Sequence, residues 1–195
     1  MHKRFIEEQD LLEDSYRLAV RIYQSGFRPN FIVGVWRGGS TVGIYVQECL
    51  QYLGVETDHI AIRTSYQGRD DYFRQLRQGS QMRAHGLQYL FENLNVDDSL
   101  LLVDDVYGTG RNVRAVIERL HAKNKRNMAR DVRVAVLYYR GESDDPAAAP
   151  DYYLHRSDDW LVLPYELTGL SRAELEAHKP WILPLLDELK PGWQS

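Results

Sequence analysis

The chain has little cysteine, no histidine cluster and no long apolar run. A single cysteine, Cys49, excludes an internal disulfide framework and fits a reducing compartment. The six histidines form no His-x-x-x-His pair and no Cys/His cluster, so we expect no dedicated zinc site. No apolar run approaches the roughly 20 residues of a membrane span. The first ten residues lack the apolar core of a signal peptide, and we therefore expect a cytoplasmic protein without a membrane partner.

A basic excess is also missing. The net charge of −4 argues against a nucleic-acid partner, because non-specific nucleic-acid binders usually carry surplus Lys and Arg. A hydrophobic content of 44% and a charged content of 27% are ordinary for a soluble globular protein. With 195 residues and no linker or repeat, we expect a single domain over residues 1–195.

Strand patterns alternate with helix patterns along the chain. Apolar periodicity predicts helices over 7–24, Val42–Leu53 and Asn112–Lys123, and apolar runs predict strands over Phe31–Trp36, Asp58–Ser65, Ser99–Asp104, Asp131–Tyr139 and Trp160–Leu167. This order indicates an α/β fold with a mainly parallel twisted sheet flanked by helices. Such sheets bind ligands beyond the carboxyl ends of their strands. Three unusual loops fall at predicted strand ends: WRGGS, SYQGRDDYFRQLRQ and DDVYGTGRN.

The segment SLLLVDDVYGTGRNV places two acids at the end of an apolar strand. Asp104 and Asp105 repel each other unless a cation or a hydrogen-bond donor lies between them. A magnesium ion is a suitable cation, and the vicinal hydroxyls of a ribose are suitable donors. The pair is therefore a candidate catalytic and Mg²⁺-binding site. The alternative is a pair of solvated acids before a glycine-capped helix.

A glycine-rich loop follows the acids and leads into a predicted helix. Glycines let backbone N–H groups turn inward, and a helix N-terminus adds positive potential, which together suit a phosphate. The residues of this candidate phosphate site are Gly108, Thr109, Gly110, Arg111 and Asn112. One segment could thus bind both ends of a ribose 5-phosphate.

LLLVDDVYGTGRN resembles the phosphoribosyl-pyrophosphate (PRPP) motif of type I phosphoribosyltransferases. In that motif four hydrophobic residues precede two acids, two variable residues and a small-residue phosphate loop. VGVWRGGS is similar to the pyrophosphate loop of the xanthine–guanine branch, which reads Arg-Gly-Gly after a strand. The resemblance implies that Arg37, Gly38 and Gly39 hold the pyrophosphate, and that a cis peptide lies next to Arg37. The alternative is a strand–turn–helix corner whose glycines serve packing.

RTSYQGRDD resembles the start of the mobile lid in the 6-oxopurine branch, where a Ser-Tyr pair stands, here Ser65 and Tyr66. A lid that excludes water suits a reaction through an oxocarbenium-like ribosyl centre, because hydrolysis competes with transfer. Arg69, with Arg74 and Arg77, would supply charge to the departing pyrophosphate. The alternative is a solvated, charged helix and loop.

Two later segments resemble the parts of the family that bind the base. In VLYYRG, Arg140 stands where purine enzymes carry a lysine that donates to the exocyclic oxygen, and a guanidinium can also donate to a carbonyl. In DDWLVLPYEL, the resemblance makes Trp160 the stacking platform and the backbone of Leu161 the reader of the base edge. Glu166 belongs to the Pro-Tyr-Glu triplet that follows. The alternative for Trp160 is a plain core position.

Three positions depart from the 6-oxopurine pattern. Gly108 replaces an aspartate that manages the proton on the purine, Asn112 replaces the last threonine of the phosphate loop, and Arg140 replaces the lysine. Proton transfer contributes about 10²- to 10⁴-fold to such a rate, so another group would have to help. Tyr107 is the catalytic candidate, and Glu166, Asp70 and Asp71 are the other possibilities.

As a whole, the resemblance implies a Mg²⁺-dependent purine-salvage enzyme. It would transfer 5-phosphoribosyl from PRPP to a purine-like base, with a 6-oxopurine favoured, and release pyrophosphate and a nucleoside monophosphate. The family fold implies a core over about 26–140, a small hood from the N-terminal segment and about 150–170, a mobile lid, and a homo-oligomer. The tail is expected to be a helix packed on the sheet or on a second subunit. A non-catalytic PRPP- or nucleotide-binding regulator is the alternative, and the glycine spacing does not fit a Rossmann-like G-x-G-x-x-G module.

Overall fold

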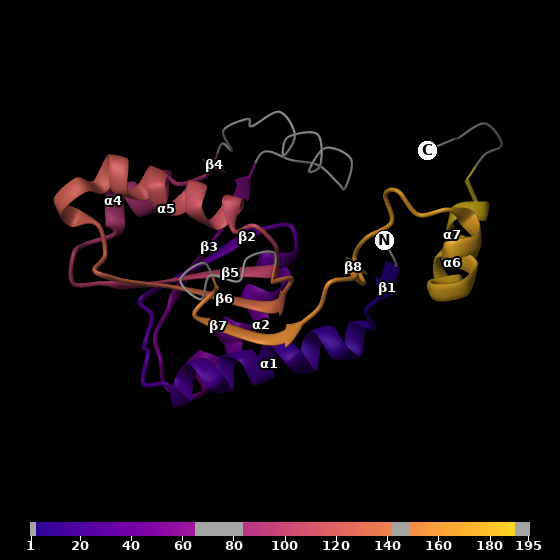
Figure 1. The fold of residues 1–195 in the computed structure, drawn as a ribbon, viewed down its shortest axis with the longest axis horizontal. Helices are drawn as coiled ribbons and strands as arrows, with labels where there is room; N and C mark the ends of the chain where they lie inside the picture. The colour runs from indigo at the N-terminus through magenta and orange to yellow at the C-terminus, as the bar shows by residue number, and fades with distance from the viewer. Residues whose placement is uncertain (1–2, 65–83, 142–148, 190–195) are drawn as a thin grey trace.

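The computed structural model describes residues 3–64, 84–141 and 149–189 (Figure 1). In chain order the elements are β1 (Lys3–Phe5), α1 (Glu8–Gln24), β2 (Phe31–Trp36), α2 (Gly38–Tyr52), β3 (Asp58–Thr64), β4 (Ala84–His85), α4 (Gln88–Asn93), β5 (Ser99–Tyr107), α5 (Arg111–Asn124), η1 (Lys125–Asn127), β6 (Asp131–Tyr139), β7 (Tyr152–Arg156), β8 (Trp160–Val162), α6 (Arg172–His178), η3 (Pro180–Ile182) and α7 (Leu183–Asp187). None of the described helices is long and apolar enough to cross a membrane.

Six strands form the main sheet, in the order β4-β3-β2-β5-β6-β7. All neighbours are parallel except β4, which runs antiparallel to β3. The chain leaves β2 through α2 to reach β3 on one side, and leaves β5 through α5 to reach β6 on the other. The order therefore reverses between β2 and β5, and ligands of open α/β sheets bind at such a switch point. The predicted α/β fold with a mainly parallel sheet is confirmed.

Helices cover both faces of this sheet, with α1 and α2 on one face and α4 and α5 on the other (Figure 1). Strand β5 supplies side chains to both layers because successive residues of a strand point to opposite faces. Leu101 and Val103 pack toward α1 and α2, whereas Leu100 and Leu102 pack toward α4 and α5. All four side chains are fully buried. The strand that carries the acid pair is thus anchored in two apolar cores.

A separate two-stranded parallel sheet pairs β1 with β8, and we call β1, β8 and residues 163–170 the hood. The C-terminal segment, residues 171–189, holds α6, η3 and α7 and lies beside the hood rather than on the six-stranded sheet (Figure 1). Phe5 of β1 stacks on His178 of α6 with ring centroids 3.7 Å apart, and Lys3 Nζ lies 2.6 Å from Glu174 Oε1. The tail prediction was thus wrong about the main sheet, because its partner is the hood.

Several predicted boundaries were wrong. Helix α2 begins at Gly38 instead of Val42, because two glycines let the helix start directly against β5. Strand β5 continues to Tyr107, so the two acids lie within the strand and not after it. The last predicted strand ends at Val162, because Pro164 opens a turn whose N–H and carbonyl groups bond locally.

Candidate functional site

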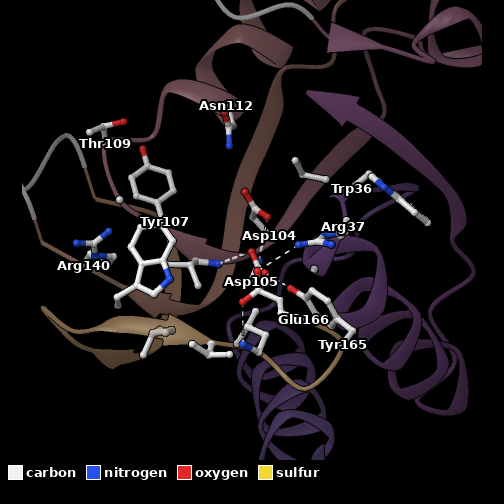
Figure 2. Close-up of a pocket in the computed structure, with 18 of the residues that line it drawn as sticks. Trp36, Arg37, Asp104, Asp105, Tyr107, Thr109, Asn112, Arg140, Tyr165 and Glu166 are labelled. Atoms are coloured by element: carbon white, nitrogen blue, oxygen red, sulfur yellow. Dashed lines mark hydrogen bonds and ion pairs between the residues drawn. The ribbon is translucent and has the colours of Figure 1, made fainter. Parts of the chain in front are cut away.

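A cavity of about 700 Å³ opens at the switch point, between the carboxyl ends of the main-sheet strands and the hood (Figure 2). It gathers residues from β2, β5, β6, β8 and the loops that follow them. The predicted site residues that line it are Arg37, Gly38, Asp104, Asp105, Tyr107, Gly108, Thr109, Gly110, Arg111, Asn112, Arg140, Trp160, Leu161 and Glu166. The predicted lid residues Ser65, Tyr66 and Arg69, with Asp70, Asp71, Arg74 and Arg77, lie outside the described residues.

The loop after β2 turns into α2 without a spacer. The Trp36–Arg37 peptide is cis, as the sequence prediction had it. A Cβ on Gly38 would overlap the carboxylate of Asp105, and a Cβ on Gly39 would overlap the carbonyl oxygen of Val103. Both glycines therefore permit close packing, and the predicted contact of their N–H groups with a pyrophosphate stays a prediction. The same close approach brings the N-terminal turn of α2 and the Arg37 side chain to the acid pair.

Asp104 and Asp105 form the centre of the cavity floor (Figure 2). Asp104 is only 6% exposed, and its pKa is raised well above the usual range by burial and by the neighbouring charge of Asp105. Each carboxylate accepts one bond from the next backbone N–H: Asp105 N lies 3.0 Å from Asp104 Oδ1, and Val106 N lies 2.8 Å from Asp105 Oδ1. Within the described residues neither carboxylate forms an ion pair, and a bound cation would supply the missing positive charge.

Magnesium fits this donor set. The described residues hold no group of three or more Asp, Glu, His or Cys side chains that could form an all-protein metal cage. Mg²⁺ does not need one, because it is usually held by one or two carboxylates together with water and substrate phosphates. Asp104 and Asp105 are two such carboxylates, and both line the cavity.

A turn of the hood supplies two further contacts to these groups (Figure 2). The Tyr165 hydroxyl donates to Asp105 Oδ2, and Arg37 Nη2 lies 3.3 Å from Glu166 Oε1. The Arg37 guanidinium also lies 5.7 Å from the centre of the Tyr165 ring. Burial and the nearby Asp105 raise the pKa of Tyr165, so its hydroxyl is a donor at neutral pH. This turn of the hood thus places a hydroxyl donor next to Asp105 and a carboxylate next to Arg37.

The glycine-rich loop lies on another side of the cavity and ends at the N-terminus of α5. Gly110 has a φ of 69°, which glycine adopts without strain, and a Cβ there would overlap the Tyr107 ring. The Arg114 side chain, in the first turn of α5, donates to the Thr109 carbonyl and so connects the loop to the helix. Tyr107 is 7% exposed, and burial raises its pKa, so its hydroxyl can donate a hydrogen bond but is not a base at neutral pH.

Arg140 and Trp160 share one end of the cavity. The Arg140 backbone N–H donates to the Tyr107 carbonyl over 2.9 Å, which ties the end of β6 to the end of β5. Its guanidinium lies 5.8 Å from the centre of the Trp160 ring. Trp160 is only half-buried and Leu161 is buried beside it. Trp160 is therefore a wall of the cavity rather than a plain core residue.

The cavity lining also includes side chains to which sequence reasoning gave no role, among them Lys3, Trp36, Arg63 and Tyr165. Tyr165 was quoted within the Pro-Tyr-Glu triplet, but only its acidic neighbour was assigned a role. Lys3 reaches the cavity because β1 pairs with β8 in the register that sets Lys3 opposite Trp160. A three-residue strand carries no periodic signal, and this pairing could not be read from the pattern.

The family of the chain follows from a comparison with known protein families. The model of the phosphoribosyl transferase domain matches residues 4–167. The chain belongs to this phosphoribosyltransferase family. The predicted membership of the type I phosphoribosyltransferases is thereby confirmed, and the match ends at residue 167, within the hood and before the C-terminal segment.

Two curated relatives carry the name bifunctional protein PyrR. The one from Ralstonia nicotianae is 39% identical over 108 residues, which cover 53% of this chain and 56% of the relative. The one from Akkermansia muciniphila is 32% identical over 130 residues, which cover 67% of this chain and 68% of the relative. The chain thus spans little more than half the length of the Ralstonia relative.

Among solved structures, the purine phosphoribosyltransferase from Pyrococcus horikoshii superposes with a TM-score of 0.64. The superposition covers 88% of this chain and 99% of that one, at 23% sequence identity. At this identity the likeness shows the phosphoribosyltransferase fold alone. The acceptor base has to be argued from the cavity.

Proposed function

We propose that this phosphoribosyltransferase catalyses the Mg²⁺-dependent transfer of 5-phosphoribosyl from PRPP to a purine-like base, with a 6-oxopurine favoured. The products are a nucleoside monophosphate and pyrophosphate. The observation that carries the proposal is the convergence of four groups on one cavity: the acid pair, the Arg37 loop, the glycine-rich loop, and the Arg140–Trp160 wall. Each group suits a different part of the two substrates.

In this proposal the main sheet binds PRPP. Asp104 and Asp105 accept hydrogen bonds from the ribose hydroxyls, and residues 108–112 bind the 5-phosphate at the N-terminus of α5. Arg37 and the N–H groups that follow it bind the pyrophosphate. A magnesium ion held by the acids would neutralise charge on the departing pyrophosphate. These groups stand on strands anchored in both cores, which keeps them aligned for in-line departure.

The base would occupy the end of the cavity under the hood. Trp160 supplies a ring face for stacking, and Arg140 supplies donors for a carbonyl oxygen on the base. The buried backbone of Leu161 adds polar groups at the base edge. A guanidinium prefers an acceptor, which favours a 6-oxo group over the amino group of adenine.

The proton on the base needs a partner other than Gly108. Tyr107 holds its own proton at neutral pH, so it would stabilise the departing group or the base as a donor. Glu166 has a pKa that burial raises, and it already accepts from Leu163 N over 3.1 Å. These two residues are the described candidates that take the place of the expected aspartate.

The test is pyrophosphate release from PRPP and Mg²⁺ with hypoxanthine, guanine, xanthine, adenine, orotate and uracil. We expect release with at least one oxopurine and none with adenine. Release with uracil alone would keep the transferase and overturn the purine assignment. No release with any base would remove the catalytic proposal.

One observation favours a second candidate, a regulator that binds PRPP or a nucleotide without turnover. Gly108 removes the side chain that the 6-oxopurine pattern uses for proton transfer, yet the groups proposed for PRPP all line the cavity. The curated relatives are also named bifunctional. Under this candidate PRPP raises the unfolding temperature of the protein but is never consumed.

Removing the Tyr165 hydroxyl is expected to tighten PRPP binding. The hydroxyl donates to Asp105 Oδ2 and so occupies the acceptor that a ribose hydroxyl would use. Tyr165→Phe frees this acceptor. The net contribution of a typical hydrogen bond is about 0.5–1.5 kcal/mol, so we expect the Kd for Mg-PRPP to fall about 3- to 10-fold. Titration calorimetry without a base measures it.

The matched control is Tyr52→Phe, at a tyrosine that is 91% exposed on α2 and far from the cavity. It should leave the Kd unchanged. Weaker binding by Tyr165→Phe would mean that the hydroxyl contacts PRPP itself and does not compete with it.

A further inference from the structure

Lys179 is the one lysine among the buried charged side chains of the described residues, with 5% of its surface exposed. Lysine is almost never buried to this extent unless it is paired. It directly follows α6, and its Nζ donates to the Leu163 carbonyl over 3.1 Å and to the Pro164 carbonyl. The ammonium group of Lys179 therefore connects the C-terminal segment to residues 163 and 164 of the hood.

The two carbonyls belong to a tight turn, Leu163–Glu166, which we call the hood turn. The Glu166 N–H donates to the Leu163 carbonyl over 3.0 Å, and Leu163 N–H donates to Glu166 Oε2 over 3.1 Å. Pro164 stands at the second position, where its fixed φ suits such a turn. Lys179 binds the outer side of the turn, while Tyr165 and Glu166 on its inner side contact Asp105 and Arg37.

Charge links Lys179 to the same turn. Glu166 faces it from the hood, and Glu7 and Glu8 face it from the start of α1. Burial lowers the pKa of Lys179, and burial also raises the pKa of Glu166, so each group reduces the desolvation cost of the other by holding its opposite charge nearby. A neutral side chain at position 179 would leave Glu166 with only Arg37 as its cationic partner among these contacts.

The segment that carries Lys179 is itself held in place. Ser171 and Glu174 form a capping box at the start of α6. Arg172 pairs with Asp187 over 3.0 Å and joins α6 to α7. The contacts of Glu174 and His178 with β1 fix the segment to the hood. Lys179 thus acts from a supported position that lies outside the family match, which ends at residue 167.

We propose that Lys179 is a positioning residue that holds the hood turn and β8 in place over the base site, and that it thereby sets affinity for the base more strongly than affinity for PRPP. The groups proposed for PRPP stand on the main sheet, at the ends of β2 and β5 and the start of α5. Leu161, proposed for the base edge, and Glu166, proposed as a partner for the proton of the base, stand on the hood within five residues of the carbonyls that Lys179 binds. This inference rests on the proposed function.

The experiment compares Lys179→Met, Lys179→Arg and Arg172→Gln in the full chain. Methionine fills similar space without a donor, arginine restores a donor and a charge, and Arg172→Gln weakens an exposed ion pair of the same segment without touching the hood turn. For Lys179→Met we expect the KM for the base to rise about 10-fold, as for one lost charge-assisted bond, and the Kd for Mg-PRPP measured without a base to change by no more than about 3-fold. Lys179→Arg should recover most of the loss, and Arg172→Gln should show none.

A purely structural role would give another pattern. If base and PRPP affinities fall together with the unfolding temperature, and arginine does not restore them, the inference is wrong while wild-type turnover still upholds the proposed function. If the wild type binds PRPP without turnover, the Kd for guanosine monophosphate replaces the KM, with the same expected 10-fold change. If the wild type binds neither ligand, the proposed function and the inference both fail.

Discussion

Asp105→Asn is expected to lower pyrophosphate release by about 10²- to 10⁴-fold, because it removes the charge that would hold two ribose hydroxyl bonds or a magnesium ion, each charged hydrogen bond being worth about 1.5–3 kcal/mol. The unfolding temperature is not expected to fall. The variant ends the repulsion with buried Asp104, and the amide oxygen can still accept from Tyr165. Steady-state kinetics with the best base and thermal unfolding measure the two effects.

The control for this variant is Asp97→Asn. The Asp97 side chain is 88% exposed, and its one ion pair within the described residues is a long one of 3.8 Å with Arg130. Its activity should equal that of the wild type. Full activity of Asp105→Asn would show that the acid pair holds neither ribose nor metal, and the proposed mechanism would have to be abandoned.

If the protein is instead a regulator, the same variant should change PRPP affinity and not a reaction rate. Asp105→Asn should then weaken PRPP binding by a similar factor, although no base is ever converted. Activity and affinity measured on the same variant therefore separate loss of chemistry from loss of the ligand. The acid pair is the right place for this comparison, because both candidates use it.

The centre of the site was predictable because it depends on local sequence. A buried parallel strand followed by a glycine-rich loop has one end at the ligand edge of the sheet, so Asp104, Asp105 and residues 108–112 had to lie together. Arg37 follows the adjacent strand β2, and parallel pairing of β2 with β5 brings the two ends to the same edge. Strand order needed the family resemblance, since periodicity alone does not say which strands are neighbours.

The hood contacts were not predictable in the same way. Tyr165 reaches Asp105 across 60 residues, and Lys179 reaches Leu163 from a segment whose pattern shows only short helices. Both contacts depend on how the β1–β8 pair packs over the cavity. Strand β1 has only three residues, which is too short for its sequence pattern to be distinguished from that of a loop. The start of α2 was missed for a different reason: sequence reasoning took two glycines as a turn, whereas in the structure they permit close packing.

Gly39→Ala is expected to destabilise the protein by about 1–3 kcal/mol, the usual cost of forcing an extra methyl into a packed core. The new Cβ would overlap the Val103 carbonyl oxygen and lie 2.8 Å from the Asp104 Cα. Both are backbone atoms of β5, which is anchored in two cores and cannot move aside. Relief would have to come from α2, which would carry the Arg37 loop away from the acids. Denaturant unfolding measures the loss of stability, and PRPP affinity should fall with it.

Gly43→Ala, one turn further along α2, is the matched control. Both variants gain the same helix propensity, about 1 kcal/mol for alanine over glycine. The atoms nearest to a Gly43 methyl belong to the His59 ring, at 2.9 Å, and the nearest backbone atom among them is the Gly34 Cα, at 3.7 Å. A side chain can therefore give way, and PRPP affinity should stay unchanged. If Gly39→Ala unfolds at the same denaturant concentration as Gly43→Ala, the contact with β5 is not what requires glycine. In that case glycine at position 39 would be required by a phosphate that approaches the backbone N–H. Gly39→Ala would then weaken PRPP binding in the titration without lowering stability.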